Sequence, residues 1–262
     1  MIAVKSQYGY QSHDLSTVEI PHIHNKKSNL VLTCGFLLSE LILYILILTT
    51  GGSLLVYSSY ISIVLCFLFS LIRSKSGDRF LISGLFCTVM ADYHLVICSP
   101  IQQLEGMVWF LIAQLLYAVT LHKRSGNTVF IWSRGILTLL AAIIAVIVLT
   151  EKTDALALVS ICYYANLIMN IVTAFSIFPD NPLLPIGFVL FLCCDTVIGL
   201  QAACGTYLTI SESSLLYRII FMDFHLSWFF YLPSQVLIAL SCSHFDKKYT
   251  FAPSPYCSFK NR

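Results

Sequence analysis

Two aspartates lie in the middle of long apolar segments of this chain. Asp92 lies within FLISGLFCTVMADYHLVIC, and Asp195 lies within LPIGFVLFLCCDTVIGLQAAC. An ionisable carboxyl at the centre of a bilayer costs several kcal/mol, so it usually marks a functional site. Two carboxyls at matched depth therefore predict one shared site.

The composition places these segments in a membrane. Of the 262 residues, 58% are hydrophobic and only 11% are charged, and the mean hydropathy is +0.82. A soluble domain carries about 25% charged residues. A single hydrophobic core cannot bury this much apolar surface away from water. We therefore expect a polytopic membrane protein that is surrounded by the lipid bilayer. The basic residues form no single patch, so a nucleic-acid partner is not expected.

Eight apolar segments are long enough to cross a bilayer as helices. Lipid offers no partner to free backbone groups, and the segments lack the alternation of strands, so the predicted fold is an all-α bundle of eight transmembrane helices over 29–243. A short re-entrant or interfacial piece could precede the last span, within 215–243. The predicted spans are 29–49, 52–72, 80–98, 104–121, 128–149, 155–178, 184–206 and 226–243.

The basic residues support an even number of spans. With eight spans, thirteen of the 15 Lys and Arg residues fall on the side of the two termini, and only Lys152 and Arg218 fall on the other. Lys and Arg collect in cytoplasmic loops. We therefore predict a polar cytoplasmic tail at 1–28 and a basic cytoplasmic tail at 244–262.

The surroundings of the two aspartates indicate an internal repeat. Gly84 precedes Asp92 by eight residues, and Gly187 precedes Asp195 by eight. The third and seventh predicted spans, which carry these pairs, run in the same direction. This pattern favours a four-plus-four parallel repeat in which related helices face one another.

Other spans carry polar residues at helical spacing, which could line a cavity with the aspartates. The simpler interpretation of each stripe is hydrogen bonding and close packing between helices. The side chains that we expect near the aspartates as substrate-binding residues are Gln114, Tyr117, Asn166, Tyr231 and Gln235.

Three further features have a lower rank as site candidates. Glu40, inside the first span, is a third candidate carboxyl. Arg134 lies near the start of the fifth span, where its side chain could extend to the membrane surface. His22 and His24 lack further ligands nearby, so no metal and no cofactor are expected.

Three motifs resemble the YhhN-like family, which includes the lysoplasmalogenases. Its motif G-L-x-F-S-x-x-G-D-x-x-L, followed by F-x-x-G-x-x-x-F-x-x-A-H-x-x-Y, is matched by Gly84, Asp92, Leu95, Gly106, Phe110, Ala113 and Tyr117. Its motif G-x-x-L-F-x-x-S-D-x-x-L is matched by Gly187, Leu190, Phe191 and Asp195, with Ile198 in place of Leu. Its segment Y-x-x-A-Q-x-L-I-A-x-S is similar at Tyr231, Gln235, Leu237, Ile238, Ala239 and Ser241.

The chain departs from the family pattern at three positions. Gln114 stands where the family motif has a histidine, and Ala91 and Cys194 replace the small Gly or Ser before each aspartate. If that histidine carries protons in relatives, its replacement by Gln114 implies changed or lost catalytic activity in this chain.

The resemblance implies hydrolysis of the vinyl ether bond of a lysophospholipid, the lysoplasmalogen. Protonation of the β carbon gives an oxocarbenium ion, which water then attacks. Two carboxyls in an apolar site suit this chemistry, because one can hold a proton while the other is ionised. Asp92 and Asp195 are thus the expected catalytic pair, as paired carboxyls are in glycoside hydrolysis. The sequence alone does not assign the two roles.

Two other function classes remain open. A proton-coupled membrane carrier would also use intramembrane aspartates and a repeat. A catalytically altered relative that binds lipid is the other alternative, and Gln114 favours it. Release of aldehyde by the purified protein in detergent separates the enzyme from both.

We expect both termini on the cytoplasmic side of the membrane, because only this topology collects the basic residues on one side. Reporter fusions or cysteine labelling at each terminus measure this directly. A C-terminus found outside the cytoplasm would mean that the spans are miscounted, most simply around 207–243.

Overall fold

The computed structural model describes residues 20–73, 79–149, 154–204 and 207–242, and in these ranges the fold is helical with no strand. The predicted all-α bundle is confirmed. The tail at 244–262 and residues 1–19 of the other tail lie outside the described residues. The elements are α1 (Ile20–Thr49), α2 (Gly52–Arg73), α3 (Arg79–Asp92), the π-helix η1 (Tyr93–Ile97), α4 (Gln103–Ser125), α5 (Val129–Leu149), α6 (Ala155–Ser176), α7 (Leu183–Ala203), α8 (Leu215–Ile220) and α9 (Leu226–Ser241).

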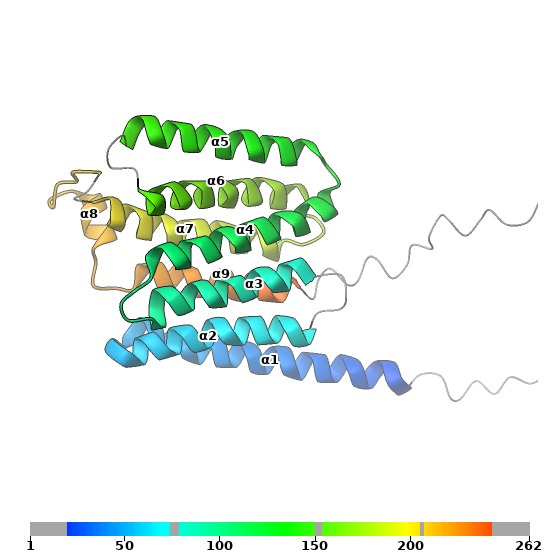
Figure 1. Cartoon of the computed structure of the whole chain (residues 1–262). Coiled ribbons are helices and arrows are strands. Elements are labelled where there is room, and N and C mark those ends of the chain that lie inside the picture. Colours follow the sequence, from blue (N-terminus) through cyan, green and yellow to red (C-terminus); the bar gives the residue numbers. More distant parts are fainter. Residues whose placement is uncertain (1–19, 74–78, 150–153, 205–206, 243–262) are drawn as a thin grey trace, which may run out of the picture. The chain divides into compact units, whose positions relative to one another are not determined.

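The chain forms two compact units, Met1–Ser39 and Glu40–Arg262. The described part of the first unit is the first two-thirds of α1. The second unit holds the rest of α1, all other helices and the candidate site. In this unit α2 to α7 and α9 run alongside one another (Figure 1).

Each predicted span corresponds to a helix. Seven helices in the described ranges are long and apolar enough to cross a membrane. The eighth, α9, has only 16 residues, so a count of eight spans stays a prediction. Helix α1 begins at Ile20, inside the segment predicted as a polar tail. The short piece expected before the last span is present as α8.

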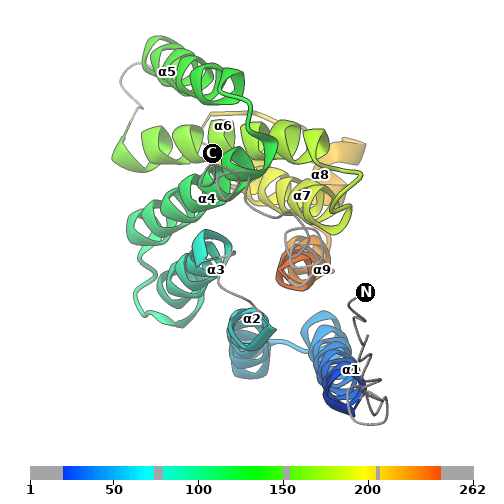
Figure 2. The same ribbon diagram turned by 90° about the vertical axis from the view of Figure 1, so that its right-hand side faces the viewer.

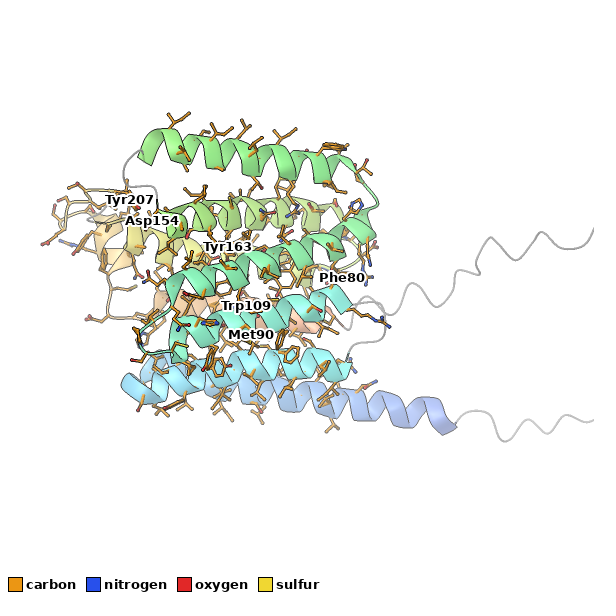
Figure 3. The ribbon with its side chains drawn as sticks, viewed as in Figure 1. Phe80, Met90, Trp109, Asp154, Tyr163 and Tyr207 are labelled. Carbon is orange, nitrogen blue, oxygen red and sulfur yellow. The ribbon has the colours of Figure 1, made fainter. Side chains whose placement is uncertain are left out.

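Several helix ends follow from local sequence. Gly126 ends α4 in the left-handed conformation, with φ 63°, where glycine has no steric penalty. Asp154, labelled in Figure 3, starts α6, because its carboxylate accepts a hydrogen bond from the backbone N–H of Ala157 at 2.7 Å. Ser214 starts α8 in the same way through Tyr217.

The outer surfaces of the helices are apolar. In α5, Leu139, Leu140, Ile143 and Ile144 are at least 46% exposed, and α5 packs mainly against α6. Contiguous apolar surface of this kind is rare on soluble monomers. Together with the seven long apolar helices, it makes the chain a multi-pass membrane protein.

Six helices of the second unit pack in a closed ring. In order, α2 contacts α3, α3 contacts α4, α4 contacts α6, α6 contacts α7, α7 contacts α9, and α9 contacts α2 (Figure 2). In this order, each helix lies opposite the one three places further round the ring, so that α2 is opposite α6, α3 is opposite α7, and α4 is opposite α9. These are the pairs that a four-plus-four repeat predicts, so the packing supports that repeat.

Equivalent glycines make the closest approaches in the two halves. A Cβ on Gly84 of α3 would lie 2.3 Å from the ring of Tyr117 on α4. A Cβ on Gly187 of α7 would lie 3.0 Å from Ile238 and 3.2 Å from the carbonyl of Ser234 on α9. Small residues let membrane helices approach closely. Each glycine thus fixes its helix against the next one, eight residues before the aspartate.

Replacement of Gly84 by alanine is expected to lower stability by about 1–3 kcal/mol, because the Tyr117 ring is fully buried and cannot move aside cheaply. Gly135→Ala is the matched control, since nothing lies within 4 Å of its added Cβ and alanine favours helices by about 1 kcal/mol. Thermal melting in detergent measures both. Equal melting temperatures for the two variants would contradict the close approach.

Candidate functional site

The Asp92 carboxyl is buried in the ring of helices. Asp92 is the last residue of α3, at the junction with the π-helical turn η1, and only 3% of it is exposed. The hydroxyl of Tyr231 on α9 donates a hydrogen bond to its Oδ2 at 2.6 Å. Single π-turns inside helices occur often at functional sites, because they redirect the side chains beside them.

The Asp195 carboxyl has a different setting. It lies midway along α7 and is partly exposed, and it accepts a hydrogen bond from the hydroxyl of Tyr163 on α6. Tyr163 is itself 3% exposed and lies inside the bundle (Figure 3). Tyr163 is a site residue that the predicted set lacks, although its place on one helix face with Asn166 and Asn170 is a signal for it.

Aromatic rings connect the two carboxyls. The Phe191 ring lies 5.4 Å from that of Tyr231 and 6.5 Å from that of Tyr163. Phe110 lies 5.8 Å from Tyr163 and 6.3 Å from Tyr231, measured between ring centroids. The two aspartates and their tyrosines therefore belong to one interior cluster.

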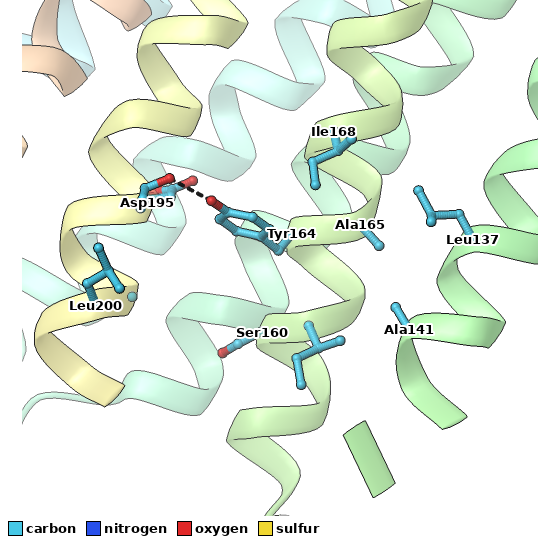
Figure 4. Close-up of a pocket in the computed structure, with 11 residues that line it drawn as sticks. Leu137, Ala141, Ser160, Tyr164, Ala165, Ile168, Asp195 and Leu200 are labelled. Atoms are coloured by element: carbon cyan, nitrogen blue, oxygen red, sulfur yellow. Dashed lines mark hydrogen bonds between the residues drawn. The ribbon is translucent and has the colours of Figure 1, made fainter. Parts of the chain in front are cut away.

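An apolar groove of about 430 Å³ leads to Asp195. Its floor is α6, and α5 and α7 form its walls (Figure 4). On the α7 side, Tyr164 and Thr196 share a hydrogen bond of 2.6 Å beside the carboxyl. The lining residues are Leu137, Ala141, Ser160, Ile161, Tyr164, Ala165, Ile168, Asp195, Thr196, Gly199 and Leu200.

A chain of polar side chains joins α4, α5 and α6. Asn170 Nδ2 donates to Gln114 Oε1 at 2.7 Å, and Arg134 Nη2 donates to Asn170 Oδ1 at 2.8 Å. Arg134 Nη1 also donates to the backbone and side-chain oxygens of Asn166, each at 3.2 Å. The expectation that Arg134 extends to the membrane surface was therefore wrong. Neutral oxygens on α6 draw its side chain inward instead.

The remaining expected site residues lie in the interior without binding the aspartates directly. Tyr117 and Gln235 are fully buried, and Asn166 bonds to Arg134 and to Thr138. In the described part of the chain, Tyr117 Oη, Gln114 Nε2 and Gln235 Oε1 have no hydrogen-bond partner. Such unpaired buried atoms leave the interior able to bond a ligand or water.

The third candidate carboxyl lies apart from this cluster. Glu40 of α1 is 3% exposed and accepts hydrogen bonds from Ser62 and Cys66 of α2. Within the second unit, it ties the last part of α1 to α2. Within the described ranges, no group of three His, Cys, Asp or Glu side chains is arranged to hold a metal ion.

The sequence profile of the YhhN family matches residues 54–242. The chain belongs to the YhhN family. The matched segment contains both aspartates, both tyrosines that bind them, and the groove. Comparisons with curated proteins and with solved structures gave no match.

Removal of one hydroxyl tests the geometry of this YhhN-family site. Tyr231→Phe is expected to lower stability by about 1–3 kcal/mol, because it leaves a buried carboxyl oxygen without its donor. Tyr44→Phe is the control: its hydroxyl donates to the carbonyl of Phe229 at an exposed position, where a loss within about 0.5 kcal/mol is expected. Melting curves in detergent compare the two, and an equal effect would contradict the buried bond.

Proposed function

We propose that this YhhN-family protein hydrolyses the vinyl ether bond of lysoplasmalogens. The products are a fatty aldehyde and a glycerophospho-base. The observation that carries the proposal is the pair of carboxyls in one cluster, of which one, Asp195, lines an apolar groove. The association of the YhhN family with lysoplasmalogenase activity supports the same reaction.

The reaction needs a proton donor and an anion. A carboxylic acid gives its proton to the β carbon of the vinyl ether, and the double bond becomes an oxocarbenium ion. Water adds to the cationic carbon and returns a proton to the carboxylate. The resulting hemiacetal breaks its carbon–oxygen bond to give the aldehyde and the free alcohol. One water is consumed, and no redox partner is needed.

The settings of the two aspartates support a division of roles. Asp195 lines the groove, so a chain lying there brings its vinyl carbon to this carboxyl, which acts as the acid. Asp92 is buried behind the aromatic cluster, and burial disfavours a carboxylate. Its role as the anion that stabilises the cation and orients water therefore rests on the hydrogen bond that the Tyr231 hydroxyl donates to it. The faces of Phe110 and Phe191 add to the stabilisation of positive charge.

The groove suits a lipid with one chain. Pockets for small ligands measure about 300–1,000 Å³ and are mostly apolar, as this one is. Because the groove lies between α5 and α7, a lipid already in the membrane can enter it from the side. A lysoplasmalogen has one alkenyl chain, and its vinyl ether follows directly after the glycerol.

A catalytically altered lipid-binding protein is the second candidate. The amide of Gln114 stands in the place of the family's histidine and is held by Asn170. An amide does not carry protons at neutral pH, so any proton transfer that relatives assign to that histidine is lost here. Binding of a lysolipid without any release of aldehyde would favour this candidate.

Asp195→Asn and Asp92→Asn are each expected to reduce aldehyde release by about 10²–10⁴-fold, because asparagine keeps the shape but removes the acid or the charge. Glu40→Gln is the matched control, since it removes a buried carboxyl outside the site and should keep activity. Turnover is measured on purified protein in detergent and is normalised to folded protein by melting curves.

The variants also separate the alternatives. Full activity in either asparagine variant would remove that aspartate from the mechanism. Loss of activity in Glu40→Gln alone would move the catalytic carboxyl to α1. A parent protein that releases no aldehyde would favour the carrier or the lipid-binding relative.

A further inference from the structure

Arg134 is a cation inside an apolar helix, and its hydrogen-bond partners among the described residues are neutral. It lies in the second turn of α5, between Trp132 and a run of apolar residues. Its side chain is partly buried, and its acceptors are amide and carbonyl oxygens of Asn166 and Asn170. In the parts of the chain that the structure describes, no carboxylate pairs with it. Ionisable groups in spans normally pair or serve a ligand.

The hydrogen bonds orient this guanidinium but do not neutralise it. Arginine has five N–H donors. Because only three hydrogen bonds to neutral oxygens are made, the remaining N–H groups of the guanidinium can donate to another ligand. A planar guanidinium with free donors matches phosphate in geometry and charge better than an ammonium group does. Among the described residues only neutral groups bond to this guanidinium, and the two asparagines hold its planar group in a fixed direction.

The position of Arg134 matches the groove. Leu137 and Ala141, which line the groove from α5, follow Arg134 by three and seven residues and so share its helix face. On α6, Tyr163 holds Asp195, and Asn166 and Asn170 hold Arg134. At 1.5 Å per residue, these contacts are about 5–10 Å apart along the helix. A glycerol backbone separates an ether carbon from a phosphate over a similar length.

We propose that Arg134, held by Asn166 and Asn170, binds the phosphate of a single-chain phospholipid whose chain occupies the groove. The assignment deepens the proposed function and rests on it for the class of lipid. It makes the phosphate the recognised part of the headgroup, while the amine beyond it stays outside this contact. Neutral single-chain glycerol ethers, which lack the phosphate, are poor ligands.

Binding of two unreactive lipids tests the site without any need for catalysis. One is a saturated 1-alkyl lysophospholipid, and the other is the matching 1-alkylglycerol. The parent protein is expected to bind the phospholipid with an affinity about 10-fold or more above that for the 1-alkylglycerol, which is the usual contribution of a charge-assisted contact. In Arg134→Gln the affinities for the two lipids should become equal. The control Arg79→Gln removes an exposed cation at the start of α3 and should keep the preference.

A second variant covers the case in which Arg134→Gln fails to fold. Asn170→Asp keeps the shape of the side chain and supplies a carboxylate next to Arg134. The donor to Gln114 is lost, but the Gln114 amide can turn its N–H groups toward the new carboxylate. It should also abolish the preference for the phospholipid, while leaving binding of the 1-alkylglycerol unchanged. Inorganic phosphate is the third probe, because its competition with the lysophospholipid would show that the anion alone is recognised.

The outcomes separate this site from the proposed reaction. A phosphate preference that persists in both folded variants would overturn the site, even if the protein hydrolyses vinyl ethers. A preference that depends on Arg134 in a protein that releases no aldehyde would retain the site and overturn the proposed reaction. Equal binding of both lipids by the parent protein would also overturn the site.

Discussion

A polar side chain inside a bilayer must find its partners within the protein, since lipid offers none. In this chain that constraint organises the interior of a six-helix ring. Asp92 bonds to α9, Asp195 bonds to α6, and Gln114 and Arg134 meet Asn170 on α6. These bonds join helices that are not consecutive in the chain as well as neighbouring ones. The candidate site and the fold therefore depend on the same set of hydrogen bonds.

The repeat gives two similar halves, but the two aspartates have different surroundings in them. Gly84 and Gly187 pack α3 on α4 and α7 on α9 in equivalent ways. Eight residues further on, the two aspartates have partners on helices that the repeat does not relate, because α9 corresponds to α4 and α6 to α2. One carboxyl is buried and the other opens to a groove. Such unequal surroundings are what an acid and an anion in one site require.

Much of the fold could be predicted from sequence, because span length and composition are local properties. The apolar segments, the short piece before the last span and the repeated spacing of Gly84 and Gly187 from the aspartates followed from such patterns. The partners of the aspartates could not be predicted in the same way. Whether Tyr163 or Asn166 reaches Asp195 depends on the tilt and rotation of α6 against α7. The inward direction of Arg134 could not be predicted either, because its place near the start of a span follows from sequence and its acceptors on α6 do not.

The central claim is that the β carbon of a vinyl ether is protonated in this site, and hydrolysis in D₂O tests it most directly. Purified protein is given a lysoplasmalogen in detergent, and the aldehyde is reduced at once to the alcohol to stop exchange. The mechanism predicts one deuterium on the carbon next to the former carbonyl, and slower turnover in D₂O. The saturated ether should give no product. Aldehyde without that deuterium, or no aldehyde at all, would contradict the claim.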